Sequence, residues 1–305
     1  MATTHPSPAV AVTPLVLKHI LVPTDFSDHS HMALKQAAAI ARLHSSDLVL
    51  LHVLPPEPAI YSALEPATWD REAILSRAQT EMQKAEADEA IAGIKHQATI
   101  EFGSFEPVLT SVIEERDISL VVLGTHGRSG ISKLILGSNA EIVFRTAPCP
   151  VLTIGPDVPP TLLTHGRFQS VLFATDFSGG SRHALPYAVG FAQESRARLT
   201  LLHVLEEGSV SAAYLHEQLS AHAHEQLDEM LPVTAQLASP VDVEVVNGYP
   251  GEAILRIARK IDTDLIVLGV HKSGGLGART SAHLPWTIAQ SVVGHAKCPV
   301  LTVRG

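Results

Sequence analysis

A glycine-rich segment in the first half of the chain has the composition of a loop that binds phosphate. Its glycines are Gly124, Gly127, Gly130 and Gly137. Glycine can adopt positive φ angles and lets a ligand approach the backbone without a Cβ in the way. Successive backbone N–H groups can then surround an anion, and Arg128 and Lys133 add positive charge. The alternative is a purely structural glycine turn, and the glycines alone leave both interpretations open.

The residues after this segment predict the start of a helix. Ser138 to Glu141 matches the capping-box pattern, so we expect Ser138 to be the N-cap. A helix N-terminus is a natural phosphate site because its first N–H groups have no partner inside the helix. No Gly-Lys-Ser or Gly-Lys-Thr sequence occurs here, so the segment is not a Walker loop.

A second candidate site residue lies in the Pro23-Thr24-Asp25 segment, directly after a predicted strand. A carboxylate at the end of a central strand can accept hydrogen bonds from ribose hydroxyls. Asp25 could instead cap the next helix, with Ser27 and Ser30 as rivals for that role. The same sequence context recurs at Asp176. That recurrence fits both interpretations, because repeated units share their caps as well as their sites.

The elements that must position these residues follow from the hydrophobic pattern. Short runs of Val, Leu and Ile alternate with longer amphipathic stretches, which predicts repeated strand–helix units. In the first half we expect strands at 18–23, 47–53, 97–102, 119–123 and 150–154, and helices at 29–44, 68–92, 105–116 and 138–146. In the second half we expect strands at 169–174, 197–204, 241–246, 264–268 and 299–303, and helices at 180–195, 210–230, 250–260 and 286–295. The strands are apolar on both faces, which predicts an α/β fold of two three-layer α/β/α domains. Ligands bind such sheets beyond the carboxyl ends of the strands, where both candidates lie.

Two copies of one unit make up the chain. Asp25 and Asp176 lie 151 positions apart, and so do His52 and His203. Copies of about 140 residues are too long for the repeats of a solenoid. A segment rich in Gly and Pro between the copies predicts a linker. We expect an N-terminal tail at 1–17, a first domain at 18–155, a linker at 156–167 and a second domain at 168–305.

Composition excludes several classes of function. The chain has 305 residues, with 22 Lys and Arg against 31 Asp and Glu, a net charge of −9. This charge disfavours binding to nucleic acid or to an anionic membrane surface. The N-terminal segment lacks a signal-peptide pattern, and no run of 18 apolar residues occurs, so we expect a cytoplasmic protein. Cys149 and Cys298 cannot form a disulfide framework or a Cys-rich zinc site, and we expect both to be small buried residues.

From about residue 18 to residue 303, the sequence resembles the universal stress protein family in its tandem two-domain form. The most specific element is the family's nucleotide loop: Gly, two residues, Gly, nine residues, Gly, and then Ser or Thr. Here the loop contains Gly124, Gly127, Gly137 and Ser138 at those positions. The segments VPTDFS, LLHV and APCPVLTI support the resemblance.

The resemblance implies the fold and the ligand. Each domain would have a five-stranded parallel sheet of order 3-2-1-4-5, as in the adenine nucleotide alpha hydrolase-like fold. The ligand would be ATP, with Mg²⁺ usual on its phosphates. Pro23 and Asp25 would hold the ribose and adenosine edge, the backbone of Val53 would meet adenine, and Gly124 would lie near the ribose. Gly127, Gly137 and Ser138 would hold the phosphates. The full set of candidate nucleotide-binding residues is Pro23, Thr24, Asp25, Val53, Gly124, His126, Gly127, Arg128, Gly137, Ser138 and Asn139.

The resemblance also implies association through the last strand of each domain. Residues 150–154 and 299–303 would pair the two domains within one chain, or pair two chains as a homodimer.

The second copy departs from the nucleotide loop. It keeps Asp176, but Lys272 stands where the second glycine belongs, and Trp286 falls at the position of Gly137. A Trp side chain would fill the space that a phosphate needs, so we expect the second domain to bind ATP weakly or not at all. A rearranged anion site that uses Lys272 and Arg279 is the alternative.

The leading hypothesis is a stress-response protein that binds ATP in its first domain as a regulatory ligand. One alternative is a scaffold or small-ligand protein that uses the second domain, and another is a slow ATPase, although no residue is an obvious base. Residues 177–181 are similar to the SGGxDS loop of ATP pyrophosphatases but lack its Asp. We expect His52 and His203 to be hydrogen-bonded core residues, and the histidines of the predicted helix 210–230 to form a solvated face.

Overall fold

The computed structural model describes residues 15–56, 70–125, 137–163, 166–206, 213–231, 237–270 and 286–305. The chain divides into two compact units, whose main parts are residues 16–167 and 168–292. The first unit also includes residues 293–301, and the second also includes residues 302–305.

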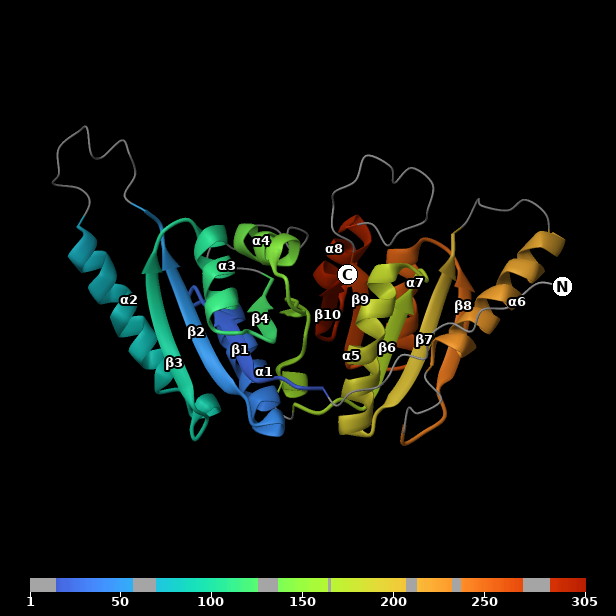
Figure 1. The fold of residues 1–305 in the computed structure, drawn as a ribbon, viewed down its shortest axis with the longest axis horizontal. Helices are drawn as coiled ribbons and strands as arrows, with labels where there is room; N and C mark the ends of the chain where they lie inside the picture. Colours follow the sequence, from blue (N-terminus) through green and yellow to red (C-terminus); the bar gives the residue numbers. More distant parts are fainter. Residues whose placement is uncertain are drawn as a thin grey trace. The chain divides into compact units, whose positions relative to one another are not determined.

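The first half of the chain is a doubly wound parallel sheet (Figure 1). Its elements are β1 (His19–Pro23), α1 (Asp28–His44), β2 (Asp47–Leu54), α2 (Arg71–Glu86), η2 (Glu89–Ile91), β3 (His96–Phe102), α3 (Phe105–Glu115), β4 (Leu120–Gly124), α4 (Ser138–Thr146), β5 (Val151–Ile154) and η3 (Pro160–Leu163). Parallel pairing places the strands in the order β3-β2-β1-β4-β5. This is the predicted order, and the strand order reverses between β1 and β4.

The second half repeats the same topology. Its elements are β6 (Ser170–Thr175), α5 (Gly179–Ser195), β7 (Arg198–Leu205), α6 (Ala213–Met230), β8 (Asp242–Asn247), α7 (Pro250–Lys260), β9 (Leu265–Val270), α8 (Trp286–His295) and β10 (Val300–Arg304). The strands follow the order β8-β7-β6-β9-β10. The pairs β6–β7, β6–β9 and β7–β8 are parallel. The predicted fold class is therefore confirmed.

The predicted helix at 68–92 is too long. The helix α2 begins at Arg71 after its N-cap Asp70 and ends at Glu86. Asp88 then starts a separate 3-10 turn, because its carboxylate accepts a hydrogen bond from the Ala90 N–H at 2.7 Å. A local side-chain cap has therefore ended a segment that hydrophobic periodicity alone would continue.

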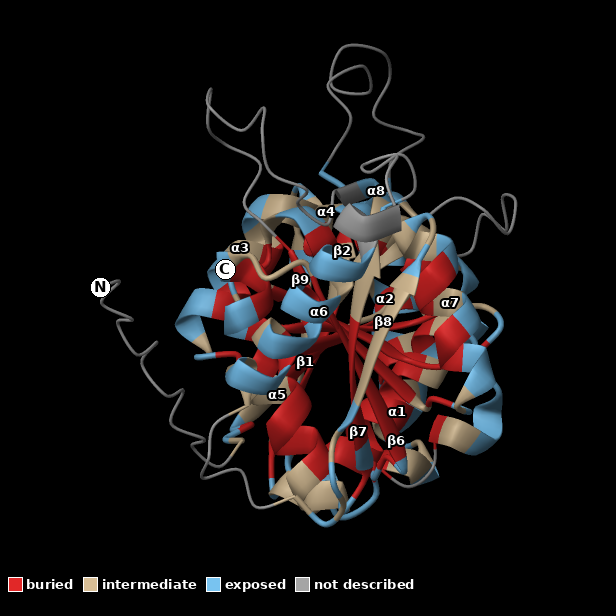
Figure 2. Cartoon of the chain, turned by 90° about the vertical axis from the view of Figure 1, so that its right-hand side faces the viewer, coloured by how far each residue is buried: buried red, intermediate tan, exposed pale blue. Residues whose placement is uncertain are grey.

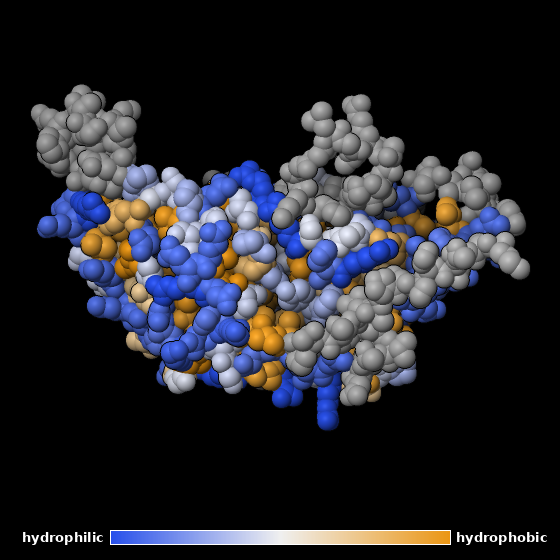
Figure 3. All heavy atoms as spheres, in the orientation of Figure 1, coloured by the Kyte–Doolittle hydropathy of each residue, from blue (hydrophilic) through white to orange (hydrophobic). Residues whose placement is uncertain are grey.

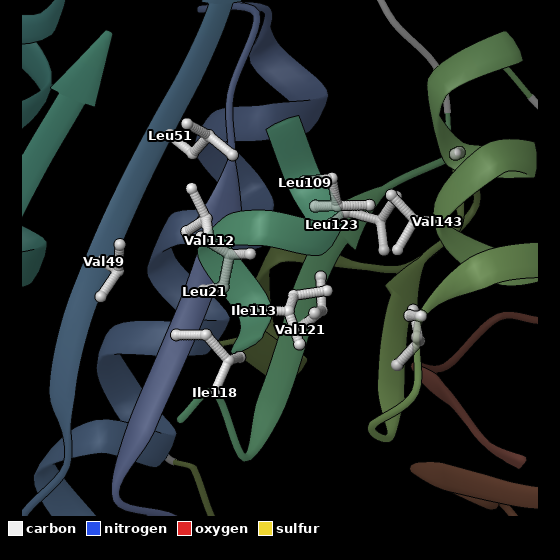
Figure 4. Close-up of a cluster of buried hydrophobic side chains, with 13 residues drawn as sticks. Leu21, Val49, Leu51, Leu109, Val112, Ile113, Ile118, Val121, Leu123 and Val143 are labelled. Atoms are coloured by element: carbon white, nitrogen blue, oxygen red, sulfur yellow. The ribbon is translucent and has the colours of Figure 1, made fainter. Parts of the chain in front are cut away.

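The central strands of the first sheet are buried on both faces, whereas the edge strand β3 is only partly buried. Leu21, Val49, Leu51, Val121 and Leu123 alternate along their strands and pack against residues of α3 and α4 (Figure 4). The residues between them face the other way and are equally buried, and that face is covered by α1 and α2. Figure 2 shows buried residues in the inner strands and exposed residues on the outer sides of the helices, with the edge strand β8 of intermediate burial. Burial on both faces is what permits central strands made mostly of Val, Leu and Ile.

The two halves share unusual backbone conformations as well as topology. Three pairs of non-glycine residues with positive φ recur at equivalent positions: Phe26 (62°) and Phe177 (61°), Ser45 (56°) and Arg196 (55°), and Asp117 (48°) and Asp262 (50°). Ser45 and Arg196 are the C-caps of α1 and α5, where a left-handed residue is common. Phe26 and Phe177 lie in the turns that follow β1 and β6, and neither is a glycine or asparagine, the residues that adopt positive φ most readily.

Hydrophilic residues cover most of the described surface in the view of Figure 3, with hydrophobic residues in smaller patches between them. Among the described residues, none of the helices has the length and apolar character needed to cross a membrane.

Both cysteines are free thiols. Cys298 is buried as expected, whereas Cys149 is only half-buried; burial raises the pKa of its thiol to about 12. That thiol therefore stays protonated and unreactive at neutral pH.

Candidate functional site

A cavity of about 320 Å³ lies at the carboxyl edge of the first sheet. It lies at β1 and β4, the point where the strand order reverses, which is where ligands bind in doubly wound sheets. The predicted site residues that line it are Pro23, Thr24, Asp25, Val53, Gly124, Gly137, Ser138 and Asn139. His126, Gly127 and Arg128 lie outside the described residues.

One wall of the cavity is the turn that carries Asp25. The N-cap of α1 is Ser27, whose hydroxyl accepts a hydrogen bond from the Ser30 N–H at 3.3 Å. Asp25 is therefore not the helix cap. Its Oδ1 accepts hydrogen bonds from the N–H of Ser27 at 3.1 Å and from the Ser27 hydroxyl at 2.6 Å. Asp25 thus fixes the cap residue and also lines the cavity.

The turn contains a strained residue, Phe26, which has a φ of 62°. A bulky residue in this conformation costs about 1–3 kcal/mol, so surrounding contacts must hold it. The Phe26 N–H donates to the Thr24 hydroxyl at 3.0 Å, and the Thr24 N–H donates to the carbonyl oxygen of Leu51 at 2.8 Å. The Nδ1 atom of His52 lies 2.7 Å from the carbonyl oxygen of Thr24, and the centroid of its ring lies 4.4 Å from that of the Phe26 ring.

The second domain contains the same turn. Phe177 has a φ of 61°, and its ring centroid lies 4.4 Å from that of His203. The Nδ1 atom of His203 lies 2.9 Å from the carbonyl oxygen of Thr175, and Asp176 accepts a hydrogen bond from the Ser178 N–H at 3.0 Å. Both histidines are hydrogen-bonded within the fold, as expected from the sequence.

Acid should destabilise the protein through His203. Burial lowers the pKa of His203 below 6.5, and the hydrogen bond to Thr175 and the nearby Asp176 only partly oppose this shift. A lowered folded-state pKa means that His203 contributes stability above pH 6.5, which is lost as the pH falls towards the lowered value. We expect the difference in unfolding free energy between wild type and His203→Asn to be largest at pH 7.5 and smaller at pH 5.5. Urea unfolding at both pH values measures it.

The comparison with His203→Asn is needed because other groups also titrate in acid. Burial raises the pKa of Glu194 and of Asp264, so each contributes stability at low pH that is lost as the pH rises through its raised pKa. Both groups are present in wild type and in the variant, and their contributions cancel in the difference. A difference that stays constant from pH 7.5 to 5.5 would contradict the assignment to His203.

Gly124 lines the cavity, but the packing of α1 against β4 is enough to explain why this residue is a glycine. A Cβ at Gly124 would lie 2.7 Å from the carbonyl oxygen of His29 in α1. At the equivalent position of the second domain, a Cβ at Gly269 would lie 2.3 Å from the carbonyl carbon of Gly180 in α5. Both contacts are shorter than real Cβ contacts, so only glycine lets the helix approach the strand this closely.

The N-terminus of α4 forms another part of the cavity lining, and here one prediction is wrong. The N-cap is Gly137, not Ser138. The Gly137 carbonyl accepts the first helical hydrogen bond, from the Glu141 N–H at 2.9 Å, so Ser138 is already the first helical residue. The capping-box interpretation fails because it places the helix start one residue too late. The Gly137 N–H is itself bonded to the carbonyl oxygen of Thr125 at 2.8 Å.

This helix start can hold an anion. The N–H groups of the first helical turn have no acceptor within the helix. Ser138, Asn139 and Ala140 belong to that turn and line the cavity. Their N–H groups and the helix dipole favour negative charge at this wall. Asp25 lies in another part of the lining, where it suits hydroxyl donors.

Sequence reasoning missed several lining residues: Ser30, His52, Phe105, Leu123, Thr125 and Ala140. Phe105 could have been found, since an aromatic residue three positions after a predicted strand lies near the carboxyl edge of the sheet. The sequence predicts His52 only as a hydrogen-bonded core residue. The loop of the second copy, residues 271–285, lies outside the described residues. Among those that are described, no group of three or more His, Cys, Asp and Glu side chains could hold a metal ion.

The universal stress protein family model matches residues 17–155 and again residues 167–304. The chain belongs to the universal stress protein family. It is 26% identical to a universal stress protein of Mycobacterium tuberculosis, over 93% of the chain and 96% of that relative. It is 30% identical over 139 residues to one of Methanocaldococcus jannaschii, which covers 45% of the chain and 81% of the relative.

Solved structures show the same fold. The crystal structure of a universal stress protein from Archaeoglobus fulgidus superposes with a TM-score of 0.67 at 22% identity, over 94% of this chain and 98% of that one. A Pseudomonas aeruginosa protein of unknown function gives a TM-score of 0.60 at 20% identity, over 94% and 92% of the two chains. Both solved structures therefore share the fold of this universal stress protein over nearly its full length.

Proposed function

We propose that this universal stress protein binds ATP in the cavity of its first domain. In this proposal the protein is cytoplasmic, and ATP is a regulatory ligand in the stress response. The observation that carries the proposal is the cavity itself. Its lining includes both the turn that carries the Asp25 carboxylate and the N-terminus of α4, at the reversal point of the sheet. These two parts of the lining have opposite chemical preferences, and a nucleotide has a hydroxyl-bearing sugar and an anionic tail that match them.

The described residues fit each part of the ligand. Asp25 would accept hydrogen bonds from the ribose hydroxyls, and the α4 N-terminus at Ser138 would hold phosphate. Phe105 and Leu123 supply apolar surface beside the backbone of Val53, which suits the adenine ring. Mg²⁺ would enter with the phosphates. His126, Gly127 and Arg128 complete the proposed set from the loop pattern.

ATP serves as a ligand rather than a substrate in this proposal. Asp25 and His52 are the titratable side chains among the described residues that line the cavity. Asp25 is assigned to the ribose hydroxyls and Nδ1 of His52 to the carbonyl oxygen of Thr24, so this proposal gives neither residue the role of a general base. Hydrolysis would be slow at most.

Two further expectations stay predictions. The first is weak or absent ATP binding by the second domain. The second is association through the last strands, within one chain or as a homodimer.

Quantifying the nucleotide that purifies with the protein tests the proposal. Protein purified without added nucleotide is denatured, and the released nucleotide is measured by chromatography, with Gly137→Trp as the comparison. We expect about one adenine nucleotide per chain in wild type and none in the variant, because a Trp side chain at the start of α4 fills the phosphate wall.

Each other outcome is informative. Two nucleotides per chain would contradict the assignment of a single competent domain. No released nucleotide, together with no heat of binding on titration with ATP and Mg²⁺, would contradict the proposal and favour the scaffold or small-ligand alternative. Retention of one nucleotide by Gly137→Trp would place the ligand elsewhere.

A further inference from the structure

His52 links the strand β2 to the turn that follows the neighbouring strand β1. Its Nδ1 lies 2.7 Å from the carbonyl oxygen of Thr24. A carbonyl oxygen only accepts, so Nδ1 carries the hydrogen and donates it. The centroid of the imidazole ring lies 4.4 Å from that of the Phe26 ring, with the two planes at 40°. His52 therefore contacts the residues on both sides of Asp25.

The other hydrogen bonds of the turn are mostly local. The Thr24 hydroxyl accepts from the Phe26 N–H and donates to the Ser30 hydroxyl at 3.1 Å, and Asp25 is bonded to Ser27. These bonds join residues 24–30 to one another and set the shape of the turn. They do not set its position relative to β2. His52 supplies side-chain contacts between the turn and β2, next to the backbone bond from Thr24 to Leu51.

We infer that His52 is a positioning residue of the nucleotide site, which holds the Thr24–Phe26 turn so that the Asp25 carboxylate is presented at the cavity. The inference rests on the proposed function for its ligand. Its structural half, that His52 holds the turn, does not depend on any ligand. Asp25 and His52 both line the cavity, so a shift of the turn would move the carboxylate at the binding surface itself.

The second domain supplies a matched control. His203 makes the same two contacts, to the carbonyl oxygen of Thr175 at 2.9 Å and to the Phe177 ring at 4.4 Å. The second domain lacks the glycine pattern of the nucleotide loop. A general loss of stability should therefore follow from changing either histidine, whereas a loss of nucleotide affinity should follow only from changing His52.

The test compares paired variants at the two positions. His52→Phe keeps an aromatic ring and removes the donor, whereas His52→Asn places an amide N–H near the position of Nδ1 and so keeps the donor. His203→Phe and His203→Asn are the controls. ATP affinity in the presence of Mg²⁺ is measured by calorimetry. Amide hydrogen exchange is followed in peptides that cover residues 24–30 and 175–181.

We expect His52→Phe to weaken ATP binding by about tenfold or more, since a misplaced carboxylate loses its charge-assisted hydrogen bonds. His52→Asn should bind within about threefold of wild type, and neither change at His203 should alter the affinity. Exchange should accelerate in residues 24–30 for His52→Phe and in residues 175–181 for His203→Phe, each without change in the other peptide.

Either half of the inference can fail separately. Unchanged exchange in residues 24–30 of His52→Phe would overturn the role of His52 in holding the turn, whatever the ligand is. Faster exchange with unchanged ATP affinity, or an equal loss of affinity in His203→Phe, would overturn its role in binding. If wild type binds no ATP, the proposed function fails, and the exchange data still decide whether His52 positions the turn.

Discussion

Replacing Gly269 by alanine should destabilise the protein by about 3 kcal/mol, even though this glycine belongs to the domain without an intact nucleotide loop. The added Cβ would lie 2.3 Å from the carbonyl carbon of Gly180 and 2.4 Å from the N–H nitrogen of Ser181. These are backbone atoms of α5, so the clash cannot be relieved by rotating a side chain. The helix must move away from β9, and its buried contacts with the sheet are lost.

Urea unfolding of three alanine variants measures the effect. Gly124→Ala should also destabilise, because its Cβ would lie 2.7 Å from the carbonyl oxygen of His29. Gly179→Ala is the control, since a Cβ there meets nothing within 4 Å, and we expect a change below about 1 kcal/mol. If Gly269→Ala unfolds at the same urea concentration as Gly179→Ala, the packing explanation for this glycine is wrong.

This result would separate two kinds of glycine that look alike in the sequence. Gly124 begins the loop pattern and was expected near a ribose, but the contact with α1 already requires a glycine there. The retention of Gly269 in the second copy follows from the same contact with α5, without any ligand. Gly137 is different, because it caps α4 at the wall of the cavity. Its equivalent in the second copy has become Trp286.

Much of the fold could be predicted because parallel α/β domains have a strong pattern. Runs such as Leu48–Leu51 are buried at every position, and they alternate with helices whose apolar residues lie on one side. The repeat then predicts the second domain from the first. The predictions that failed concern single hydrogen bonds. Asp88 starts a new turn after α2, and Gly137 rather than Ser138 accepts the first bond of α4. Hydrophobic periodicity does not predict the exact residue at which a helix begins or ends.

The candidate site was only partly predictable, for a physical reason. Residues at strand ends, such as Asp25 and Val53, follow from the topology, since all carboxyl ends meet at one edge. The conformation of Phe26 does not follow from its type, because a positive φ is unfavourable for an aromatic residue. It depends on contacts with His52, which lies 26 positions further along the chain. Such contacts become visible only once the strands are placed side by side.

Changing Asp25 to asparagine should abolish most nucleotide affinity while leaving the fold intact. Asparagine retains an oxygen that can accept the hydrogen bonds from the Ser27 N–H and hydroxyl, so the turn and the cap of α1 persist. The variant loses the negative charge that would strengthen hydrogen bonds from the ribose hydroxyls. Hydrogen bonds to a charged group contribute about 1.5–3 kcal/mol, so we expect ATP affinity to fall by about 10- to 100-fold.

Asp176→Asn is the matched control, because Asp176 occupies the same turn in the second domain. It should bind ATP as wild type does, and both variants should unfold within about 1 kcal/mol of wild type in urea.

The ligand can be altered as well as the protein. If Asp25 holds the ribose, wild type should bind 2′-deoxy- or 3′-deoxy-ATP more weakly than ATP, because one hydroxyl donor is missing. Asp25→Asn should discriminate much less between these ligands, since the charge-assisted bond is already lost. Calorimetric titration of wild type and Asp25→Asn with ATP, 2′-deoxy-ATP and 3′-deoxy-ATP measures whether the effects of the two changes are additive. Equal discrimination by wild type and Asp25→Asn would show that the carboxylate does not contact the sugar. The role of Asp25 would then be limited to holding Ser27 at the start of α1.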